Sequence, residues 1–339
     1  MQFKKYGSIE NLSLTKFVNS VIYNFPNVTN IRFVVLEKAH GSHFSFQTDG
    51  INITCAKRSS IIANNENFYN HLDLLENYKE KIILLFKTIL NKYPNTIGIQ
   101  IDGEIIGGCY PHVDVKSLNI PKVQKGVYYC PDYRFYAYDI VIFDTDNNSS
   151  FLNYDVCIEL FKECNFYYAK PLFEGSLKDA MLFNPEFQTT LPKDFGFPEI
   201  IGNFAEGVVI KPVESLIMPN GSRVIFKNKN DKFNEIQTKV EDKSLNLFDD
   251  IPDHIKEIAE NMMLMITENR LDNVISKIGE VTKKDEGKLI GLLSKDILEE
   301  FEKLYGESWS SIVKNEQKIV TKKLSNQCRI LISNYFINQ

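Results

Sequence analysis

Apolar and polar positions near the start of the chain form short runs that predict strands. Residues 31–36 are a dense apolar run, and residues 44–54 alternate between apolar and polar on either side of Asp49-Gly50. An Asp-Gly pair between alternating segments is a strong signal for a β-hairpin. We therefore expect a buried strand followed directly by a hairpin.

A long amphipathic helix is predicted over residues 72–93. Apolar residues recur there at helical spacing, and Pro94 ends the pattern. Further strands are expected at residues 97–101, 134–143, 207–211 and 223–227. Strands with one long helix between them favour an α+β architecture over regular βαβ winding.

The pattern changes after residue 232. Residues 233–250 are polar and carry no clear period, which indicates a linker, whereas the remainder has helical periodicity. A length of 339 residues agrees with two domains, at roughly 150 residues per domain. We expect an α+β domain over residues 1–232, a linker over 233–250 and a helical domain over 251–339.

Composition limits the class of protein. Hydrophobic residues make up 43% of the chain and charged residues 24%, which excludes a wholly disordered or fibrous protein. The net charge of −5 argues against a protein coated in nucleic acid, but not against a local basic groove, because phosphates are bound locally. No segment is apolar enough for a signal peptide or a membrane span.

The cysteines indicate the redox compartment. All six lie outside CxxC pairs and away from histidines, so neither a zinc site nor a secreted disulfide framework is expected. We expect a soluble protein in a reducing, cytoplasmic compartment, without membrane contact.

Several familiar phosphate-binding motifs are absent from the sequence. It contains no GxxxxGK[ST], no GxGxxG and no GxSxG. Residues 144–148 resemble the start of a calcium loop, but Ser149 stands where that loop needs Gly, and Asp155 stands where it needs Glu. A polar turn between strands is the better interpretation.

Lys38 lies where the apolar strand ends and the hairpin begins, within Glu37-Lys38-Ala39-His40-Gly41. An ammonium group resists burial unless it is paired, so a lysine in this position is unusual. Its ordinary pKa of about 10.4 leaves roughly one lysine in a few thousand neutral at pH 7. A nucleophilic lysine therefore needs desolvation or cationic neighbours that lower its pKa. The alternative is an exposed lysine at a strand end without a catalytic role.

Further charged and aromatic residues occupy predicted strands or strand ends. Arg58 ends the hairpin, so it can lie beside Lys38. Lys227 and Lys229 share one face of a strand because strands have a two-residue period. The other candidates of this kind are Glu104, Tyr138, Glu206 and Lys211. Each has a structural alternative, with the tyrosine in the core and the lysines on a solvated strand face.

In this order, Lys38, Glu104, Glu206, Lys227 and Lys229 resemble the covalent nucleotidyltransferase superfamily of ligases and capping enzymes. The local sequences EKAHGSHFSF, TCAKRS, FYAYDI, AEGVVIKP and RVIFKNKNDKF are similar to the RNA ligase 2 type, which includes phage and RNA-editing ligases. NRLDNVISKIGE and DILEE are similar to the helical domain of that family. The resemblance covers nearly the whole chain. It implies an α+β nucleotidyltransferase (ATP-grasp-like ligase) domain of antiparallel sheets and helices, followed by an all-helical domain.

The resemblance implies an ATP-dependent RNA ligase that acts as a monomer. Lys38 would attack the α-phosphate of ATP and form lysyl-AMP, and the AMP would pass to a 5′-phosphate of RNA. A 3′-hydroxyl would then displace the AMP and seal the strand, with nicked duplex RNA as the expected substrate. Charge accumulates on phosphoryl oxygens at each step, so cations should stabilise the reaction.

The resemblance also implies a role for each candidate residue. The expected nucleotide and metal contacts are Glu37 at the adenine end, Tyr138 on the purine, Glu104 at the ribose or a metal, Glu206 at Mg²⁺ (or Mn²⁺), and Lys227 and Lys229 at the α-phosphate. These two lysines would also lower the pKa of Lys38. Arg58 would bind a terminal phosphate of RNA, and His40 and Lys211 would be secondary phosphate contacts.

In the helical domain, Arg270 and the nearby Lys277 are the expected phosphate contacts to RNA. Asp296 would orient such a cation or cap a helix. A-form duplex is recognised mostly by shape and backbone contacts, which suits a second domain that clamps RNA. A solvated helix face is the alternative for each of the three.

Two features depart from the usual family pattern. His43 stands where the family usually has Asn, a residue that makes a polar contact near the triphosphate in that family. The segment over residues 105–133 is longer than in the shortest members, and it is expected to be a surface loop that contacts RNA or a partner protein.

Two rival functions remain open. A DNA ligase or a capping enzyme would carry an OB domain after residue 240, whereas the sequence there has helical periodicity. An RNA-binding module without catalysis would not need the full set of catalytic residue types, all of which are present.

Overall fold

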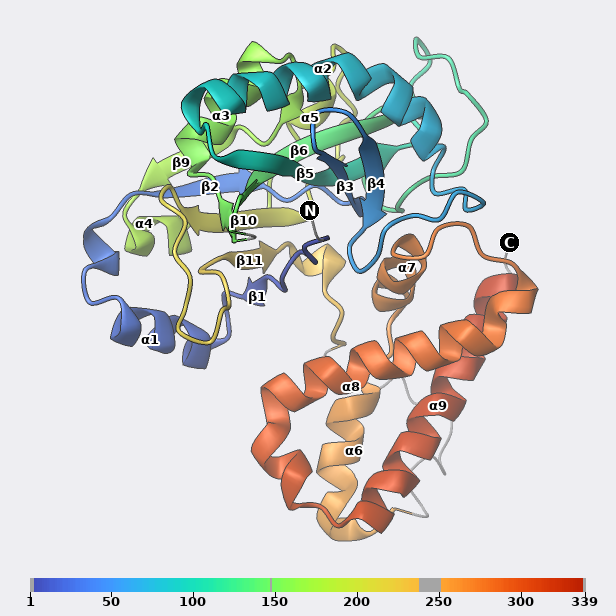
Figure 1. Cartoon of the computed structure of the whole chain (residues 1–339). Coiled ribbons are helices and arrows are strands. Elements are labelled where there is room, and N and C mark those ends of the chain that lie inside the picture. Colours follow the sequence, from blue (N-terminus) through green and yellow to red (C-terminus); the bar gives the residue numbers. More distant parts are fainter. Residues whose placement is uncertain (1–2, 147, 238–250, 338–339) are drawn as a thin grey trace. The chain divides into compact units, whose positions relative to one another are not determined.

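The computed structural model describes residues 3–146, 148–237 and 251–337. The chain divides into two compact units, Met1–Lys232 and Phe233–Gln339. The first is built from two largely antiparallel sheets with flanking helices, and the second is helical (Figure 1). The α+β fold with a helical C-terminal part, as the sequence predicts, is confirmed. No helix in the described ranges is long and apolar enough to cross a membrane.

The first sheet has five strands, and the apolar run near the N-terminus forms one of its interior strands. Its order is β1 (Glu10–Asn11), β11 (Phe226–Lys229), β10 (Gly207–Pro212), β2 (Phe33–Glu37) and β9 (Pro171–Gly175). Neighbours are antiparallel except β1 and β11, which are parallel. Helices α1 (Thr15–Asn24) and α4 (Leu177–Met181) pack on one face of this sheet. Every residue of β2 is buried, which explains its unbroken apolar run.

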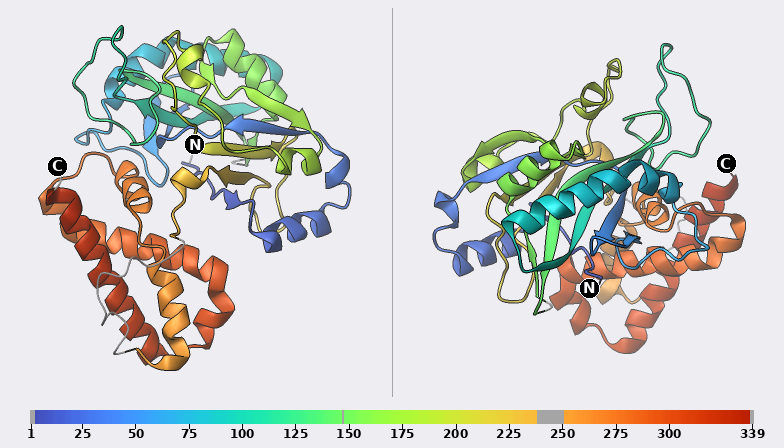
Figure 2. Two further views of the ribbon diagram at one scale, coloured as in Figure 1. Left: turned by 180° about the vertical axis from the view of Figure 1, so that it is seen from behind. Right: turned by 45° about the horizontal axis from the view of Figure 1, so that its top comes forward.

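The second sheet has six strands. Its order is β4 (Ile53–Lys57), β3 (Ser42–Thr48), β5 (Thr96–Gly107), β6 (Tyr133–Asp144) and β7 (Ser149–Phe151), all antiparallel, with β8 (Tyr167–Tyr168) parallel to β6. β3 and β4 form the hairpin predicted around Asp49-Gly50. Helices α2 (His71–Lys92) and α3 (Tyr154–Glu163) cover the outer face (Figures 1 and 2).

Helix α2 is the long helix that the sequence predicts. Its buried apolar stripe includes Leu74, Tyr78, Ile82, Leu85 and Ile89, and it packs against the aromatic and branched residues of β3, β5 and β6. Full burial of a large apolar side chain contributes about 1.5–3 kcal/mol. The stripe therefore covers the outer face of the second sheet. The inner face of the second sheet is turned toward the first sheet.

Strand β11 begins three residues later than the sequence suggests. Residues 223–225 precede the strand, and Arg223 forms only an isolated bridge with Ile217. Its side chain forms an ion pair with a buried carboxylate described below.

The second unit consists of α6 (Lys256–Met263), α7 (Glu268–Ser276), α8 (Glu286–Ser311) and α9 (Lys314–Ile337), with short 3₁₀ turns at Asp253–Ile255 and Lys283–Asp285. These helices enclose one apolar core that includes Met262, Leu293, Phe301 and Leu324. Residues 233–237 belong to this unit, and the Gln237 amide donates to the Leu264 carbonyl (2.9 Å). Residues 238–250, the rest of the predicted linker, lie outside the described residues.

Candidate active site

Lys38 follows β2 directly and is held from both its backbone and its side chain. Its amide donates to the Gly207 carbonyl (2.9 Å), which ties the end of β2 to the start of β10. Its Nζ lies 2.6 Å from Glu206 Oε2, with the lysine side chain 20% exposed. Lys38 is thus a partly accessible ammonium group paired with a buried carboxylate.

Glu206 is the centre of a cluster of basic side chains. Besides Lys38, its carboxylate lies 3.1 Å from Lys229 Nζ and 3.2 Å from His40 Nδ1, and its side chain is only 1% exposed. Burial alone would raise the pKa of Glu206, but the charges of Lys38, Lys229 and His40 outweigh it and hold the pKa well below its ordinary value. The structure thus brings together four of the residues that the sequence singled out.

Glu104, on β5, is the second carboxylate of the site. Burial raises its pKa to about 8, the charge of Glu206 adds to this rise, and Lys38 and Arg58 oppose it. At neutral pH, therefore, Glu104 holds a proton while Glu206 is ionised. Carboxyl groups with pKa values shifted strongly in opposite directions are found preferentially at functional sites.

The geometry of β10 and β11 places the two predicted lysines on one face. Gly207 pairs with Lys229, and Val209 pairs with Lys227. Cross-strand partners project to the same side of a sheet, and Val209 lines the pocket described next. Lys227 and Lys229 therefore lie on the face that bears the pocket.

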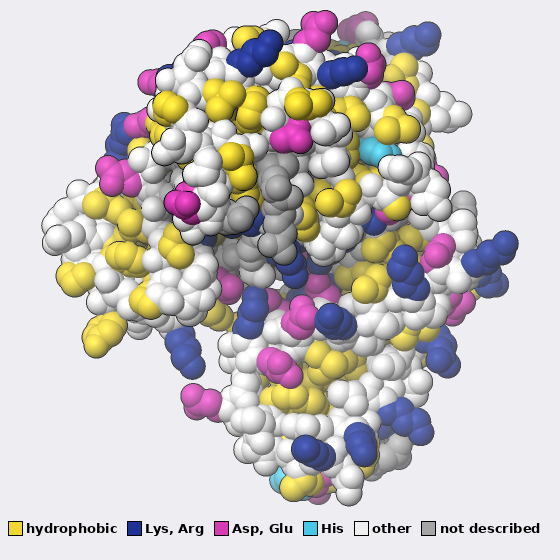
Figure 3. Space-filling view, viewed as in Figure 1, with side chains coloured by type: hydrophobic (Ala, Val, Ile, Leu, Met, Phe, Trp, Pro, Cys, Tyr) yellow, Lys and Arg dark blue, Asp and Glu magenta, His cyan; other side chains and the backbone are white. Residues whose placement is uncertain are grey.

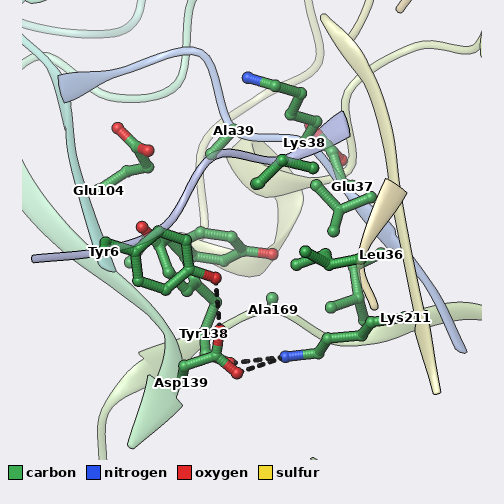
Figure 4. A pocket seen from close by; sticks show the side chains of 14 residues that line it. Tyr6, Leu36, Glu37, Lys38, Ala39, Glu104, Tyr138, Asp139, Ala169 and Lys211 are labelled. Atoms are coloured by element: carbon green, nitrogen blue, oxygen red, sulfur yellow. Dashed lines mark hydrogen bonds and ion pairs between the residues drawn. The ribbon is translucent and has the colours of Figure 1, made fainter. Parts of the chain in front are cut away.

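A pocket lies between the inner faces of the two sheets (Figure 4). Its apolar lining comes mainly from the first sheet, with Leu36, Val209 and Ile225, while Tyr138 lines it from β6. Lys38 and Glu104 lie toward one end in Figure 4. A pocket with an apolar lining and an aromatic side chain suits a planar heterocycle such as a purine.

The opposite end of the pocket in Figure 4 holds a buried charge network around Asp139. Its carboxylate lies 2.7 Å from Lys211 Nζ and 2.6 Å from Arg223 Nη1, and it accepts a hydrogen bond from the Tyr6 hydroxyl (2.6 Å). Burial would raise the pKa of Asp139, but Arg223 and Lys211 lower it overall. Lys211 also donates to the Tyr138 carbonyl (3.0 Å), so a phosphate contact by Lys211 would require these bonds to open.

Tyr6, Asp139 and Arg223 are pocket or network residues that the sequence reasoning did not select. Tyr6 lines the pocket and packs edge-on against Tyr138, with ring centroids 5.4 Å apart. A usable signal existed only for Asp139, since a charged residue inside the apolar alternation of a central strand needs a buried partner. Tyr6 lies in a short polar segment without periodicity, so nothing indicated that it crosses the pocket.

Glu37 lines the same pocket from the end of β2. It is 3% exposed, and it accepts hydrogen bonds from the Thr190 amide and hydroxyl (both 2.8 Å) and from the Thr189 hydroxyl. Burial raises its pKa to about 7, although these hydrogen bonds oppose the rise. The threonines, at the start of α5 (Leu191–Asp194), were not found from the sequence.

Arg58 and His43 lie at the margin of the site. The Arg58 guanidinium Nη2 is 3.3 Å from the Gly7 carbonyl, and its charge lowers the pKa of Glu104, so it lies near that carboxyl group. His43 is half-buried, with Nε2 3.3 Å from Asp102 Oδ1 and its ring 5.1 Å from the Tyr6 ring.

In the helical unit, Arg270, Lys277 and Asp296 are brought together. Asp296 lies 2.8 Å from Arg270 Nη1 and 2.7 Å from Lys277 Nζ. The Arg270 side chain is 3% exposed and also donates to the Met265 carbonyl. Of the two cations, Lys277 is therefore the accessible one, with its side chain 41% exposed. On the face of this unit seen in Figure 3, Lys and Arg are scattered among Asp and Glu.

Comparisons with known proteins match both parts of the chain to ligase families. Residues 31–229 match a family model described as RNA ligase, and residues 249–329 match one described as T4 RNA ligase 2 C-terminal. RNA-editing ligase 2, mitochondrial, of Trypanosoma brucei brucei is 31% identical over 348 aligned positions, covering 88% of this chain and 83% of that protein. RNA-editing ligase 1 of the same organism is 28% identical, covering 79% and 70%.

Among solved structures, an RNA ligase of Naegleria gruberi, a mutant described with ATP and Mn, aligns at 16% identity with a TM-score of 0.45. The alignment covers 69% of this chain and 58% of that chain.

Proposed function

Since the chain belongs to the RNA ligase family, as an ATP-dependent RNA ligase of the RNA ligase 2 type, we propose that it seals 3′-hydroxyl and 5′-phosphate ends of RNA in nicked duplexes. The family resemblance read from the motifs is thereby confirmed. The steps that follow, with lysyl-AMP and RNA-adenylate as intermediates, are our proposal for how these residues act.

The observation that carries the proposal is the position of Lys38 at a pocket lined by Tyr138 and apolar side chains, paired with Glu206 beside Lys229. An ammonium group has no lone pair, so Lys38 must release its proton to solvent, to which its side chain is partly exposed, and leave Glu206 before it attacks the α-phosphate of ATP. As the bond from Nζ to the α-phosphorus forms, the bond from that phosphorus to the bridging oxygen breaks and pyrophosphate leaves with that oxygen. Lys229 and Lys227, on the pocket face of β11, would neutralise the charge that accumulates on the phosphoryl oxygens.

The pocket supports the orientation of the nucleotide. The purine would lie against Tyr138 and the apolar side chains of the first sheet, with Glu37 at its edge. Because Glu37 has a pKa of about 7, it can act as donor or acceptor toward the base near neutral pH. The ribose and the phosphates would then extend toward Glu104 and Lys38.

A divalent ion fits the donor set of the site. Mg²⁺ prefers oxygen ligands and usually binds through one or two carboxylates plus substrate phosphates. Glu206 is ionised and would be the first such ligand, and Glu104 would become the second once it releases its proton. Within the described ranges, no group of three or more potential ligand residues forms a metal cage, so the phosphates would supply the remaining ligands. Once bound, Mg²⁺ (or Mn²⁺) would reduce the negative charge on those phosphates.

Arg58 and the helical unit would serve the later steps. The guanidinium of Arg58 is suited to a terminal phosphate of RNA, and its place near Glu104 supports that role. In the helical unit, Lys277 would contact a backbone phosphate, while Asp296 holds it beside Arg270. We thus propose that residues 1–232 form the adenylation domain and that residues 251–339 form an RNA-binding domain.

We also propose that the enzyme is a monomer in a reducing, cytoplasmic compartment, which its six free cysteines would suit. A protein partner on the outer part of residues 105–133 remains part of this proposal.

Sealing assays on matched substrates test the proposal. Nicked RNA duplex, RNA on a DNA splint, single-stranded RNA and nicked DNA should be compared at equal concentration. We expect nicked RNA to be sealed fastest. Preferential sealing of nicked DNA would favour the rival DNA ligase, and no sealing of any substrate would favour a binding module.

A further inference from the structure

The long connection between β5 and β6 has two halves of different character. Residues 111–122 are exposed or partly exposed, and this outer half extends away from the body of the unit (Figure 2). In the inner half, Val123, Gln124, Val127, Tyr129 and Cys130 are buried. A loop that served only as an outside surface would not bury these five residues.

The inner half reaches the backbone of the segment that carries Lys38. The Tyr129 hydroxyl accepts a hydrogen bond from the His40 amide (2.8 Å), and Gln124 Nε2 donates to the Gly41 carbonyl (3.4 Å). Tyr129 is 1% exposed. Burial raises the pKa of its phenol well above the ordinary value, so this hydroxyl stays neutral at any working pH.

The same inner half is clamped to the segment that carries Glu206. The Tyr128 amide donates to Asn203 Oδ1 (2.9 Å), and Asn203 Nδ2 donates to the Tyr128 carbonyl (2.6 Å). Asn203 is buried and precedes Glu206 by three positions. Two hydrogen bonds to one residue hold the backbone at Tyr128, and hence the neighbouring tyrosine, in a defined place.

Tyr129 is absent from the lining of the pocket. Its only described polar contact with the catalytic segment is the hydrogen bond to the His40 amide. It can therefore affect the reaction through the position of the backbone between Lys38 and Gly41, and not through contact with the nucleotide.

We propose that Tyr129 is a positioning residue for lysyl-AMP formation: its hydroxyl holds the His40 amide and so directs Lys38 and His40 toward the α-phosphate. The inference rests on the proposed function, because it presumes Lys38 as the nucleophile. It gives the inner half of the β5–β6 connection a catalytic purpose that is separate from any partner bound by the outer half.

The test is Tyr129→Phe, which removes one oxygen and keeps the ring. Small misplacement of a reacting group costs large factors in rate, so we expect the rate constant of adenylation in a single turnover with labelled ATP to fall about 10- to 100-fold. The KM for ATP should stay within about twofold, since the nucleotide contacts are intact.

A second reaction separates positioning from general damage. Sealing of a nicked RNA that is already adenylated does not use Lys38 as a nucleophile, so Tyr129→Phe should seal it at the wild-type rate. Tyr128→Phe is the matched control, because its hydroxyl makes no hydrogen bond within the described chain while its backbone bonds to Asn203 remain. Asn203→Asp, which loses the donor to Tyr128, should reproduce the selective loss of adenylation.

Each outcome decides the inference. Equal adenylation by Tyr129→Phe and wild type would overturn it, and so would a parallel loss of adenylation and of sealing of adenylated RNA, which would mark a structural role alone. All rates are compared at a temperature where thermal melting shows every variant folded. If the wild-type enzyme itself forms no adenylate, the proposed function fails instead.

Discussion

Gly207→Ala tests the geometry that joins β10 to β11 beside Glu206. Gly207 has φ +142°, and a Cβ there would lie 2.1 Å from the Asn228 carbonyl oxygen and 2.7 Å from Lys229 Cα. Both obstacles are backbone atoms, so no side chain can move aside. The alanine must shift β11 away, and this shift takes Lys229 from Glu206.

The expected loss of stability has two parts. A residue with a Cβ in this backbone region costs about 1–3 kcal/mol, and overpacking against the neighbouring strand costs about 1–3 kcal/mol more. We expect the free energy of unfolding, measured by urea titration, to fall by about 2–6 kcal/mol. Adenylation measured where the variant is still folded should fall as well.

Gly202→Ala is the matched control. Gly202 has φ +80° with nothing within 4 Å of an added Cβ, so only backbone strain of about 1–2 kcal/mol applies, and adenylation should persist. If Gly207→Ala were no less stable than Gly202→Ala and adenylated normally, the described packing of β10 on β11 would be refuted.

Three further changes have separate readouts. Glu104→Gln should become more stable relative to wild type as pH rises from 5 to 8. The folded wild-type carboxyl keeps its proton up to a pKa of about 8, whereas the unfolded chain releases that proton, so wild type loses about 1.4 kcal/mol of stability per pH unit. Urea titration at several pH values measures the difference, and a parallel pH dependence of the two proteins would contradict it. Asp139→Asn leaves the buried Lys211 and Arg223 without their carboxylate and should lower stability by about 3–5 kcal/mol, which thermal melting checks; an unchanged melt would count against the network. A chain truncated to residues 1–240 should form lysyl-AMP yet seal nicked RNA poorly, and undiminished sealing would exclude the helical domain as a clamp.

Much of the fold follows from local patterns. The hairpin at Asp49-Gly50, the helix that became α2, and the helical C-terminal unit were predicted because each rests on periodicity within one segment. The pairing of β2 with β10 and β9, and the short β1, were not predictable in this way. Pairings between strands far apart in the chain leave no periodic signal in either strand.

Site residues that lie in recognisable motifs were predictable from the sequence. Site residues whose partners are far away in the sequence were not. Lys38, His40, Glu206 and Lys229 meet as one cluster, in keeping with their selection from strand ends. The roles assigned to the candidate residues stay predictions. Tyr6 could not be predicted from the sequence, because its hydrogen-bond partner Asp139 is 133 residues away and no local pattern indicates the pair.

The most direct measurement is to locate the AMP itself. The protein should be incubated with ATP and Mg²⁺, digested, and analysed by tandem mass spectrometry, with Lys38→Ala in parallel and thermal melting to show that the variant is folded. We expect AMP on Lys38 in the wild-type chain and no adduct in the variant. AMP on another residue, or an undiminished adduct in Lys38→Ala, would contradict it.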